Sequence, residues 1–380
     1  MRAEIVDAIG PVDSTQWNRL QGTDSPFLRH EFLAAMESTG CVGPGTGWLP
    51  CHVLLFDARQ RLAGAMPLYR KTNSWGEFVF DFAWADAYHQ AGLSYYPKLV
   101  SAIPYTPATS ARCLAAPDQD RSVVIRELVA AARQYAMEIK ASSVHLLFPT
   151  PDEVGQLEQE GLLLRKDCQF HWHNRNYQNF DDFLGELTSV KRKKLRRERR
   201  RIEEAGIRFQ TLHGDELDEA AWTAIMPLYA SSFWRRGRQP YLNRDFFLEV
   251  SRQLPDKIVV ILAQYQSEPI ACAICFRSDE TLFGRYWGSS GRYHSLHFET
   301  CYYQGIDYCI ANGLARFEPG TQGEHKISRG FVATECWSAH WLSHPQFAAA
   351  MDHFLDRERG YIDEYMDAVR EHEPYRRDLE

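Results

Sequence analysis

The segment Glu318–Lys326 gathers carboxylates, an imidazole and an ammonium group within a few residues. It reads Glu-Pro-Gly-Thr-Gln-Gly-Glu-His-Lys, so that Glu324, His325 and Lys326 stand next to one another in a glycine-rich stretch. A carboxylate or an imidazole can accept a proton from an attacking group, and an ammonium can stabilise an oxyanion. Binding and catalytic residues are common on such loops, whereas a solvated surface lysine is the alternative. We expect this segment to be functional.

A second concentration of charge lies between Lys191 and Arg201, where nine basic residues accompany one acidic residue. The whole chain has a net charge of −7, so the overall balance argues against a protein that coats nucleic acid. It favours one local anion-binding feature instead. We expect phosphates of a donor to bind there, and the residues concerned are Arg196, Arg197, Arg199 and Arg200. The alternative is a solvated helix whose charge the rest of the chain neutralises.

Gly288-Ser-Ser-Gly291 precedes a predicted helix. Its backbone N–H groups could bind an anion at Ser289, Ser290 and Gly291, and a flexible turn is the alternative. In the first half, Asp81, Trp84 and Asp86 place acids beside aromatic rings, which suits a cationic or amine-bearing acceptor. An ordinary turn at the end of a strand would have the same composition.

Two patterns resemble metal sites. Cys272 and Cys275 form a CxxC, but residues three apart on a strand point to opposite faces, and no second CxxC or HxxxH supplies further ligands. His171 and His173 share one strand face without additional ligands, which usually means packing or a hydrogen bond. We therefore expect no metal.

The order of predicted elements is the same in both halves of the chain. A hairpin is followed by an aromatic strand, an amphipathic helix and a closing strand. In the first half these are 52–57, 62–69, 75–84, 121–140 and 144–148, with a short helix at 152–160. In the second half they are 257–264, 269–276, 281–287, 295–312 and 314–318, with Ser295 as the helix N-cap. This repeated pattern predicts two similar α/β lobes.

The basic run is predicted to join the two lobes as a helix. A short acidic helix at 181–187 precedes it, and Gly206 ends it. A last amphipathic helix covers 346–370. We expect three parts: an N-terminal lobe of residues 1–180, a basic linking helix of residues 181–206, and a C-terminal lobe of residues 207–380 that carries the reactive segment.

The bulk composition agrees with an ordinary globular protein. The chain has 380 residues, which predicts two domains, and 44% of them are hydrophobic and 13% aromatic. The sequence contains no run of 18 apolar residues, so it predicts no transmembrane helix. The N-terminal MRAEIVDAIGPVDS lacks the pattern of a signal peptide. Nine cysteines form no regular disulfide framework. We expect a cytoplasmic protein.

Several longer motifs resemble one protein family. They are Trp48–Pro50, Phe80–Asp86, Tyr95–Leu99, Arg285–Gly288, Leu296–Glu299 and Phe317–Lys326. Together they resemble a bacterial family of predicted N-acyltransferases, associated with peptidoglycan biosynthesis or recognition and grouped with the Fem peptidyltransferases and the GNAT superfamily. The likeness runs from about Ser25 to the C-terminus. It implies an α/β fold with mixed sheets and two GNAT-like acyltransferase lobes in tandem.

The resemblance also implies roles for individual residues. In GNAT-like folds two neighbouring strands separate and admit the carbonyl of the donor, which here would involve 281–287 and 314–318. Lys326 takes the place of the transfer-site lysine of Fem-type enzymes, with Arg329 beside it, and Glu318 is the first choice for the base, ahead of Glu324 and His325. The expected contacts to the substrate are Asp81, Trp84, Asp86, Arg285, Tyr286, Trp287, His297, Glu299, Glu324 and Arg329. His297 and Glu299 are further candidates for the base, but they diverge by about 200° on a helix, so at most one of them faces the site.

These expectations define an acyltransferase of the EC 2.3 class that moves an acyl or aminoacyl group from a thioester or an aminoacyl-tRNA ester to a small-molecule or peptide amine. The donor would be a co-substrate, namely acyl-CoA, acyl-carrier protein or aminoacyl-tRNA, and no cofactor would be tightly bound. The usual cofactor loop Gln/Arg-x-x-Gly-x-Gly/Ala is absent before helix 295–312, which argues against acetyl-CoA. The acceptor is expected in a cleft between the lobes. The alternative function is a non-catalytic module that binds an anionic cell-wall precursor or a similar ligand.

Overall fold

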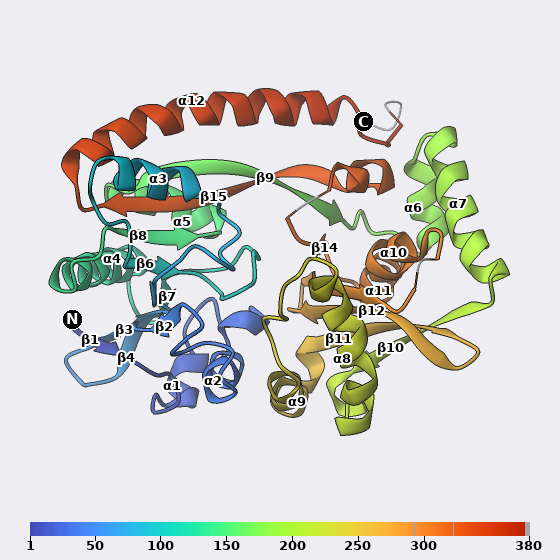
Figure 1. Ribbon diagram of the computed structural model, residues 1–380, viewed down its shortest axis with the longest axis horizontal. Coiled ribbons are helices and arrows are strands. Elements are labelled where there is room, and N and C mark those ends of the chain that lie inside the picture. Colours follow the sequence, from blue (N-terminus) through green and yellow to red (C-terminus); the bar gives the residue numbers. More distant parts are fainter. Residues whose placement is uncertain (292, 322, 377–380) are drawn as a thin grey trace. The chain divides into compact units, whose positions relative to one another are not determined.

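The computed structural model describes residues 1–291, 293–321 and 323–376, and the chain divides into two compact units (Figure 1). Unit 1 consists of Met1–Cys168 and Glu335–Glu364. Unit 2 consists of Gln169–Thr334 and the segment that begins at Tyr365. No helix within the described ranges is long and apolar enough to cross a membrane.

Unit 1 is built on two sheets. One has the strand order β1-β3-β4-β7, and the other contains β15-β8-β6-β5-β2. The elements are β1 (Arg2–Val6), α1 (Ser14–Asn18), α2 (His30–Ser38), β2 (Trp48–Pro50), β3 (His52–Phe56), β4 (Leu62–Met66), β5 (Tyr69–Lys71), α3 (Phe82–Gln90), β6 (Lys98–Ser101), β7 (Leu114–Ala115), α4 (Arg121–Glu138), β8 (Ser143–Leu147), α5 (Pro151–Gln159), the start of β9 (Leu163–His173), most of β15 (Val332–Leu342) and most of α12 (Pro345–Arg370).

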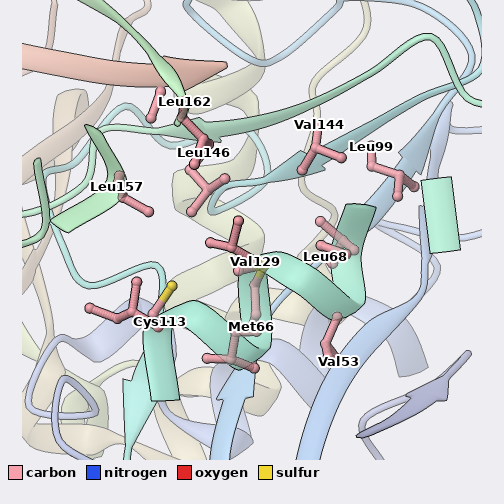
Figure 2. Close-up of a cluster of buried hydrophobic side chains, with 14 of the residues drawn as sticks. Val53, Met66, Leu68, Leu99, Cys113, Val129, Val144, Leu146, Leu157 and Leu162 are labelled. Carbon is pink, nitrogen blue, oxygen red and sulfur yellow. The ribbon is translucent and has the colours of Figure 1, made fainter. Parts of the chain in front are cut away.

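The core of unit 1 lies around α4 (Figure 2). Asp120 caps this helix by accepting hydrogen bonds from the backbone N–H groups of Ser122 and Val123. Val124, Leu128 and Ala132 follow at helical spacing and are fully buried against both sheets. Removing a side chain such as Leu128 from this core would cost about 2–5 kcal/mol of stability. The predicted helix 121–140 and the hairpin of β3 and β4 are therefore confirmed.

The predicted strand 75–84 is wrong. Residues 75–81 form no strand, and α3 begins at Phe82. Aromatic side chains favour strands, but Trp84 and Tyr88 are four residues apart and bury one face of a helix in a cluster with Tyr95. The alanines between them favour the helix as well. Tertiary packing at helical spacing outweighed the strand propensity of the rings.

Unit 1 is completed by a segment from the far end of the chain. Residues Ser338–Leu342 of β15 pair antiparallel with Ser143–Leu147 of β8. In α12, Met351 and Leu355 then pack in the cluster that contains Trp84. Residues 335–364 were predicted to lie in the C-terminal lobe, whereas they belong to unit 1, because long-range strand pairing has no local signal in the sequence.

Unit 2 is built on a sheet with the strand order β10-β11-β12-β13-β14-β9. Its elements are the end of β9, α6 (Phe180–Glu186), α7 (Ser189–Glu204), β10 (Ile207–His213), α8 (Glu219–Trp234), α9 (Arg244–Gln253), β11 (Ile258–Tyr265), β12 (Glu268–Arg277), β13 (Thr281–Ser289), α10 (Leu296–Phe298), the π-helical turn η4 (Glu299–Tyr303), α11 (Gln304–Ala311), β14 (Arg316–Glu318), the 3-10 helix η5 (Glu324–Arg329) and the start of β15.

The predicted elements of the second half are present in unit 2. β11 and β12 form the predicted hairpin, whose turn residues Gln266 and Ser267 both have positive φ. The basic helix α7 ends at Glu204 and has Ala205 as its C-cap. Gly206 follows with φ +72°. The predicted helix 295–312 exists as α10, η4 and α11, but Ser295 is not its side-chain cap. Its φ is +69°, and its hydroxyl bonds His294 Nδ1 at 2.7 Å instead.

Candidate active site

Two neighbouring strands at the centre of unit 2 are parallel and stop pairing early. β13 and β14 pair only from Thr281 with Arg316 to Phe283 with Glu318. β13 continues to Ser289, whereas β14 ends at Glu318. These are the two strands between which we expected the donor carbonyl to enter.

The residue that follows β14 still lies close to β13. A Cβ atom on Gly284 would lie 3.2 Å from the Cα atom of Pro319, so the small residue permits this contact. One residue later, β13 contains a β-bulge opposite β12, because Ile274 pairs with Tyr286 and Cys275 with Gly284. Arg285 is the inserted residue. Bulges of this kind redirect side chains and are common next to active sites.

Lys326 lies in η5, a short distance along the chain from the end of β14. Its side chain is buried, with 1% of the residue exposed, and Nζ donates a hydrogen bond to the carbonyl oxygen of Gly320 at 2.6 Å. No carboxylate within the described ranges forms an ion pair with it. Burial lowers the pKa of Lys326 to about 7. A lysine of this kind can change its protonation state at neutral pH.

Glu198 connects the basic helix to the turn that carries Lys326. It is the one acidic residue of the run 191–201, and it is buried. Both of its carboxylate oxygens accept hydrogen bonds from Arg329 Nη2, at 2.9 and 3.0 Å, and Tyr303 of η4 donates another. Arg329 also donates to the carbonyl oxygen of His325 at 2.8 Å and lies 3.4 Å from the ring centre of Phe298. α7, η4 and η5 are thereby tied together.

Rings and imidazoles surround this turn. His325 is hydrogen-bonded to the hydroxyl of Tyr302 at 2.8 Å, and its ring centre lies 5.9 Å from that of His297. His297 in turn packs against Trp287 of β13 at 5.2 Å. Burial, followed by the neighbouring charges of His325, Arg329 and Lys326, lowers the pKa of His297 to about 4. Burial and the charges of Arg329 and Lys326 also lower the pKa of His325. Both imidazoles are therefore neutral at pH 7.

The carboxylates near the site differ in their surroundings. Glu318 is buried at the last paired position of β14, with Arg316 Nε 3.4 Å from its Oε1. Glu324 is exposed and accepts a hydrogen bond from Tyr365 at 3.0 Å. Glu299 is buried in η4 and binds Arg199 at 3.2 Å and Gln304 at 2.8 Å. Of His297 and Glu299, His297 lies next to His325, whereas Glu299 is paired with the basic helix.

The basic helix exposes only part of its charge. Arg199 is held by Asp307 at 2.6 Å and by Glu299, so its charge is compensated within unit 2. Arg196, Arg197 and Arg200 are exposed. Arg196 pairs with Asp181 at 2.8 Å and Arg200 with Glu204 at 3.5 Å, and such exposed pairs contribute little. Three of the four predicted phosphate ligands are thus open to solvent.

The predicted anion loop after β13 has both of its hydroxyl groups in hydrogen bonds. Ser289 donates to the carbonyl oxygen of Gly291 at 3.1 Å, and Ser290 donates to that of Ile270 at 3.2 Å. These bonds fix the loop. The backbone N–H groups of Ser289 and Ser290 also donate within the protein, to Ser231 Oγ at 3.2 Å and to the carbonyl oxygen of Ile270 at 2.8 Å.

The predicted acceptor residues of the first half lie in unit 1. Asp81 is buried and accepts hydrogen bonds from Tyr95 at 2.6 Å and from Lys98. Burial alone would raise the pKa of Asp81, but the charge of Lys98 holds it at about 2. Its negative charge is therefore compensated inside the unit. Trp84 is buried in the core, and Asp86 is exposed.

Nothing in the sequence indicated that Lys98 is buried, or that it would bind two acids. Its ammonium donates to Glu77 at 2.7 Å as well as to Asp81, and Lys71 lies 3.9 Å from Glu77. A charged residue in a short strand is indistinguishable by pattern from one that faces water. A buried charged residue can be told from a solvent-exposed one here only by the burial of β5 and β6 in the fold.

Within the described ranges, no three His, Cys, Asp or Glu side chains gather as a metal site. Cys272 and Cys275 are both buried in β12, and burial raises the pKa of each thiol to about 12. Protonated thiols of this kind behave as small apolar side chains.

Comparison with known proteins places this chain in a family. The FemAB-like family model, described as peptidoglycan biosynthesis/recognition, matches residues 8–377. The fold is similar to that of FemX (TM-score 0.54, 10% identity, covering 93% of this chain and 100% of that one). It is also similar to the C-terminal domain of a putative lysylphosphatidylglycerol synthetase from Agrobacterium fabrum (TM-score 0.54, 10% identity, covering 90% of this chain and 95% of that one). A third similar structure is L-PGS from Bacillus licheniformis (TM-score 0.52, 11% identity, covering 86% of this chain and 96% of that one). No curated protein matches the chain by sequence.

Proposed function

Because the chain belongs to the FemAB-like family, we propose that it is an N-acyltransferase that moves an acyl or aminoacyl group from an activated donor to an amine. The observation that carries this proposal is the position of Lys326. A buried lysine amine, without an ion pair to a carboxylate among the described residues, follows the point where the pairing of β13 with β14 ends. Burying such a charge is costly, and functional sites are where proteins retain it.

The reaction would be a direct attack on the donor. The amine nitrogen forms a bond to the acyl carbon, the carbonyl oxygen becomes an oxyanion, and the ammonium of Lys326 stabilises it. The bond from carbon to the ester oxygen or thioester sulfur then breaks, and the leaving group takes up a proton. Because the pKa of Lys326 is about 7, the lysine can remain charged through the step at neutral pH and below.

The attacking amine must lose a proton. Glu318 is our first choice for the base, because it is buried at the end of β14 where the strands stop pairing. His325 is the second choice, since its imidazole is neutral at pH 7 and precedes Lys326 directly. Glu324 is exposed and bonded to Tyr365, which makes it the third.

The donor would carry phosphate groups. Arg196, Arg197 and Arg200 give α7 an exposed basic surface, and α7 packs against both η4 and η5. A phosphate-rich donor bound along α7 would therefore lie next to the turn that holds Lys326. An aminoacyl-tRNA would use more of these charges than acyl-CoA or an acyl-carrier protein. We place aminoacyl-tRNA first among the three.

The test uses hydroxylamine as a small surrogate amine, so that no acceptor has to be known. The protein is incubated with a panel of aminoacyl-tRNAs, acyl-CoAs and acyl-carrier proteins, and hydroxamate is measured by mass spectrometry. Protein-dependent hydroxamate from one donor class supports the proposal and identifies that class. If every donor is left intact while tRNA or a cell-wall precursor still binds, the chain is a binding module and the proposal fails.

A further inference from the structure

Unit 1 contains a pocket of about 330 Å³ where its late segment joins the rest of the unit. Its walls come from the end of α3, the end of α4, the residues before β8 and the two residues between β15 and α12. Ser343 fixes this junction, because its N–H group and its hydroxyl both donate to the carbonyl oxygen of Ser142, each at 2.9 Å. The volume is in the range of pockets that hold small molecules.

Two buried polar atoms of the lining residues have no hydrogen-bond partner within the described ranges. They are the hydroxyl oxygen of Tyr88 and Nδ1 of His344. Tyr88 is 2% exposed, and its ring centre lies 5.2 Å from that of Tyr95 and 4.1 Å from that of Phe347. Burial raises the pKa of Tyr88 to about 12, so its hydroxyl keeps the proton at neutral pH and can donate it to an acceptor. Unpaired buried polar groups are costly, and a ligand that pairs with them removes this cost.

Lys140 supplies a positive charge to the same pocket. It is exposed, and none of the described residues forms an ion pair with its ammonium group. Its φ is +54°, the left-handed conformation that glycine usually takes directly after a helix. A lysine in this conformation is less favourable for the fold than a glycine. None of the described residues that line the pocket is an aspartate or a glutamate, so its charge favours an anion.

The helix ends at the pocket also affect the charge of a ligand. The last carbonyl oxygens of α3 and α4 already accept backbone hydrogen bonds, at 2.9 Å from Leu93 to Tyr88 and at 2.8 Å from Ala141 to Ala136. α12 begins directly after His344, and the N-terminal end of a helix favours negative charge. These ends therefore agree with an anionic ligand.

One side of the pocket is apolar. Leu93 and Met137 line it and are 38% and 61% exposed, and methionine adapts its shape readily to a ligand. A single ammonium suits a monoanion, whereas phosphate is usually bound by more donors or by a guanidinium group. We propose that this pocket binds a small apolar monocarboxylate. The carboxylate pairs with Lys140 and with the hydroxyl of Tyr88, and the apolar chain packs against Leu93 and Met137.

Such a ligand would stabilise unit 1. The pocket takes residues from both segments of this unit, so the ligand links residues 343–344 to residues 88–142. A ligand that binds only the folded state raises the unfolding temperature as its concentration increases. This site does not depend on the proposed acyl transfer.

The experiment measures binding of octanoate to the full chain by isothermal titration calorimetry and by the shift in melting temperature. We expect a Kd of about 1 mM or lower. Octylamine and inorganic phosphate should bind at least about 10-fold more weakly, since the first carries the wrong charge and the second has no apolar chain. Tyr88→Phe should weaken octanoate binding about 5-fold, the value of one hydrogen bond. Lys140→Gly should weaken it about 2- to 5-fold, as expected for an exposed charge.

The same two variants distinguish a ligand site from a structural role. Without octanoate, both should melt at the wild-type temperature or above it, because phenylalanine removes an unpaired buried hydroxyl and glycine accepts the left-handed conformation. The matched controls are Tyr69→Phe and Arg59→Gln. Tyr69 has another buried hydroxyl without a hydrogen-bond partner among the described residues, Arg59 is exposed, and both lie in unit 1 outside the pocket. These controls should leave the affinity for octanoate unchanged.

Several outcomes would overturn the proposal. Octanoate could fail to bind at about 10 mM, octylamine could bind as well as octanoate, or both pocket variants could keep the wild-type affinity. An equal loss in the pocket variants and in the controls would show that octanoate binds without a defined site and would also overturn it. Octanoate binding by a chain that forms no hydroxamate from any donor would leave the pocket established and remove the proposed transferase function. The two proposals can therefore fail separately.

Discussion

At the scale of single residues, the proposed chemistry depends on the charge of Lys326. Lys326→Met keeps the length and the apolar stem of the side chain but removes the ammonium. If the ammonium stabilises the oxyanion, the transfer rate should fall by about 10²–10³ while the affinity for the donor stays nearly constant. Lys326→Arg should recover part of the rate, since it keeps the charge with a different geometry. Steady-state hydroxamate formation and donor binding check both effects, and a Met variant with wild-type rates would remove Lys326 from the mechanism.

The pH dependence of the rate should separate the two charged groups. Burial lowers the pKa of Lys326 to about 7, so its cationic form is lost, and the rate should fall, as the pH rises through 7. A base such as Glu318 is lost at low pH, when it becomes protonated, so the rate should also fall there. Lys326→Arg should shift the fall at high pH upward, because a guanidinium stays charged, and Glu318→Gln should abolish the fall at low pH. Rate profiles across the acidic, neutral and alkaline ranges measure both limbs. An unchanged high-pH limb in the Arg variant would assign that limb to another group.

The sequence singled out the segment that we propose to be reactive, but it missed the residue that holds this segment. Lys326 was found from a glycine-rich, charged loop and from its resemblance to the Fem-type lysine. Glu198 was counted only as the one acidic residue of the basic run, although Leu195, Glu198 and Ile202 lie at helical spacing on one face. An acid on the apolar face of a basic helix was the signal that could have found it. Its partner Arg329 is 131 residues away and could not be located without the fold.

At the scale of elements, Glu198 links three segments that are separate in the sequence. Glu198→Gln would leave the buried guanidinium of Arg329 without its anion, and we expect a loss of about 3–5 kcal/mol in the free energy of unfolding. Glu198→Gln combined with Arg329→Met should recover part of this loss, because the remaining groups are neutral. Urea unfolding of both single variants and the double variant measures the coupling, and additive effects would show that the pair is not coupled.

The basic helix should bind its phosphates through its exposed arginines. Replacing Arg196, Arg197 and Arg200 by Gln should weaken donor binding and reduce the dependence of log Kd on log salt by roughly 2–3, about one for each phosphate that is no longer neutralised. Arg208→Gln is the matched control, since it removes an exposed charge outside α7. Filter binding of tRNA between low and moderate salt provides the slopes. A slope unchanged in the triple variant would make α7 a structural helix only.

The helices α4 and α5 of unit 1 and the hairpin of β11 and β12 in unit 2 were predicted, because apolar residues at a period of 3.6 or of two mark them directly. The helices α1, α2, α8 and α9 were not predicted. The strand predicted at 75–84 shows where this fails. Its rings favour a strand when read singly, but Trp84 and Tyr88 pack at helical spacing in one cluster with Met351 and Leu355. Those partners come from the far end of the sequence, so the deciding interactions could not be read locally.

At the scale of the whole molecule, unit 1 depends on residues 335–364. A chain of residues 1–168 alone would leave the β8 strand without β15 and would expose Trp84 and Tyr88. We expect no cooperative thermal unfolding from it. Joining Cys168 to Glu335 by a short glycine-serine linker and ending at Glu364 should restore cooperative unfolding, because Lys166 Nζ lies only 2.6 Å from Glu335. Calorimetry of the two chains is the measurement, and a cooperative transition in residues 1–168 alone would contradict this account.

The dependence of unit 1 on residues 335–364 also determines when this unit can fold during synthesis. The ribosome releases the N-terminus first, yet the β15 strand of unit 1 emerges only after residues 169–331. Until then, the edge of β8 and the apolar face of α3 stay uncovered in a long nascent chain. Unit 1 therefore reaches its final form only after residues 335–364 have left the ribosome. A message that is truncated before codon 335 would yield a product that chaperones and proteases can recognise by its open sheet.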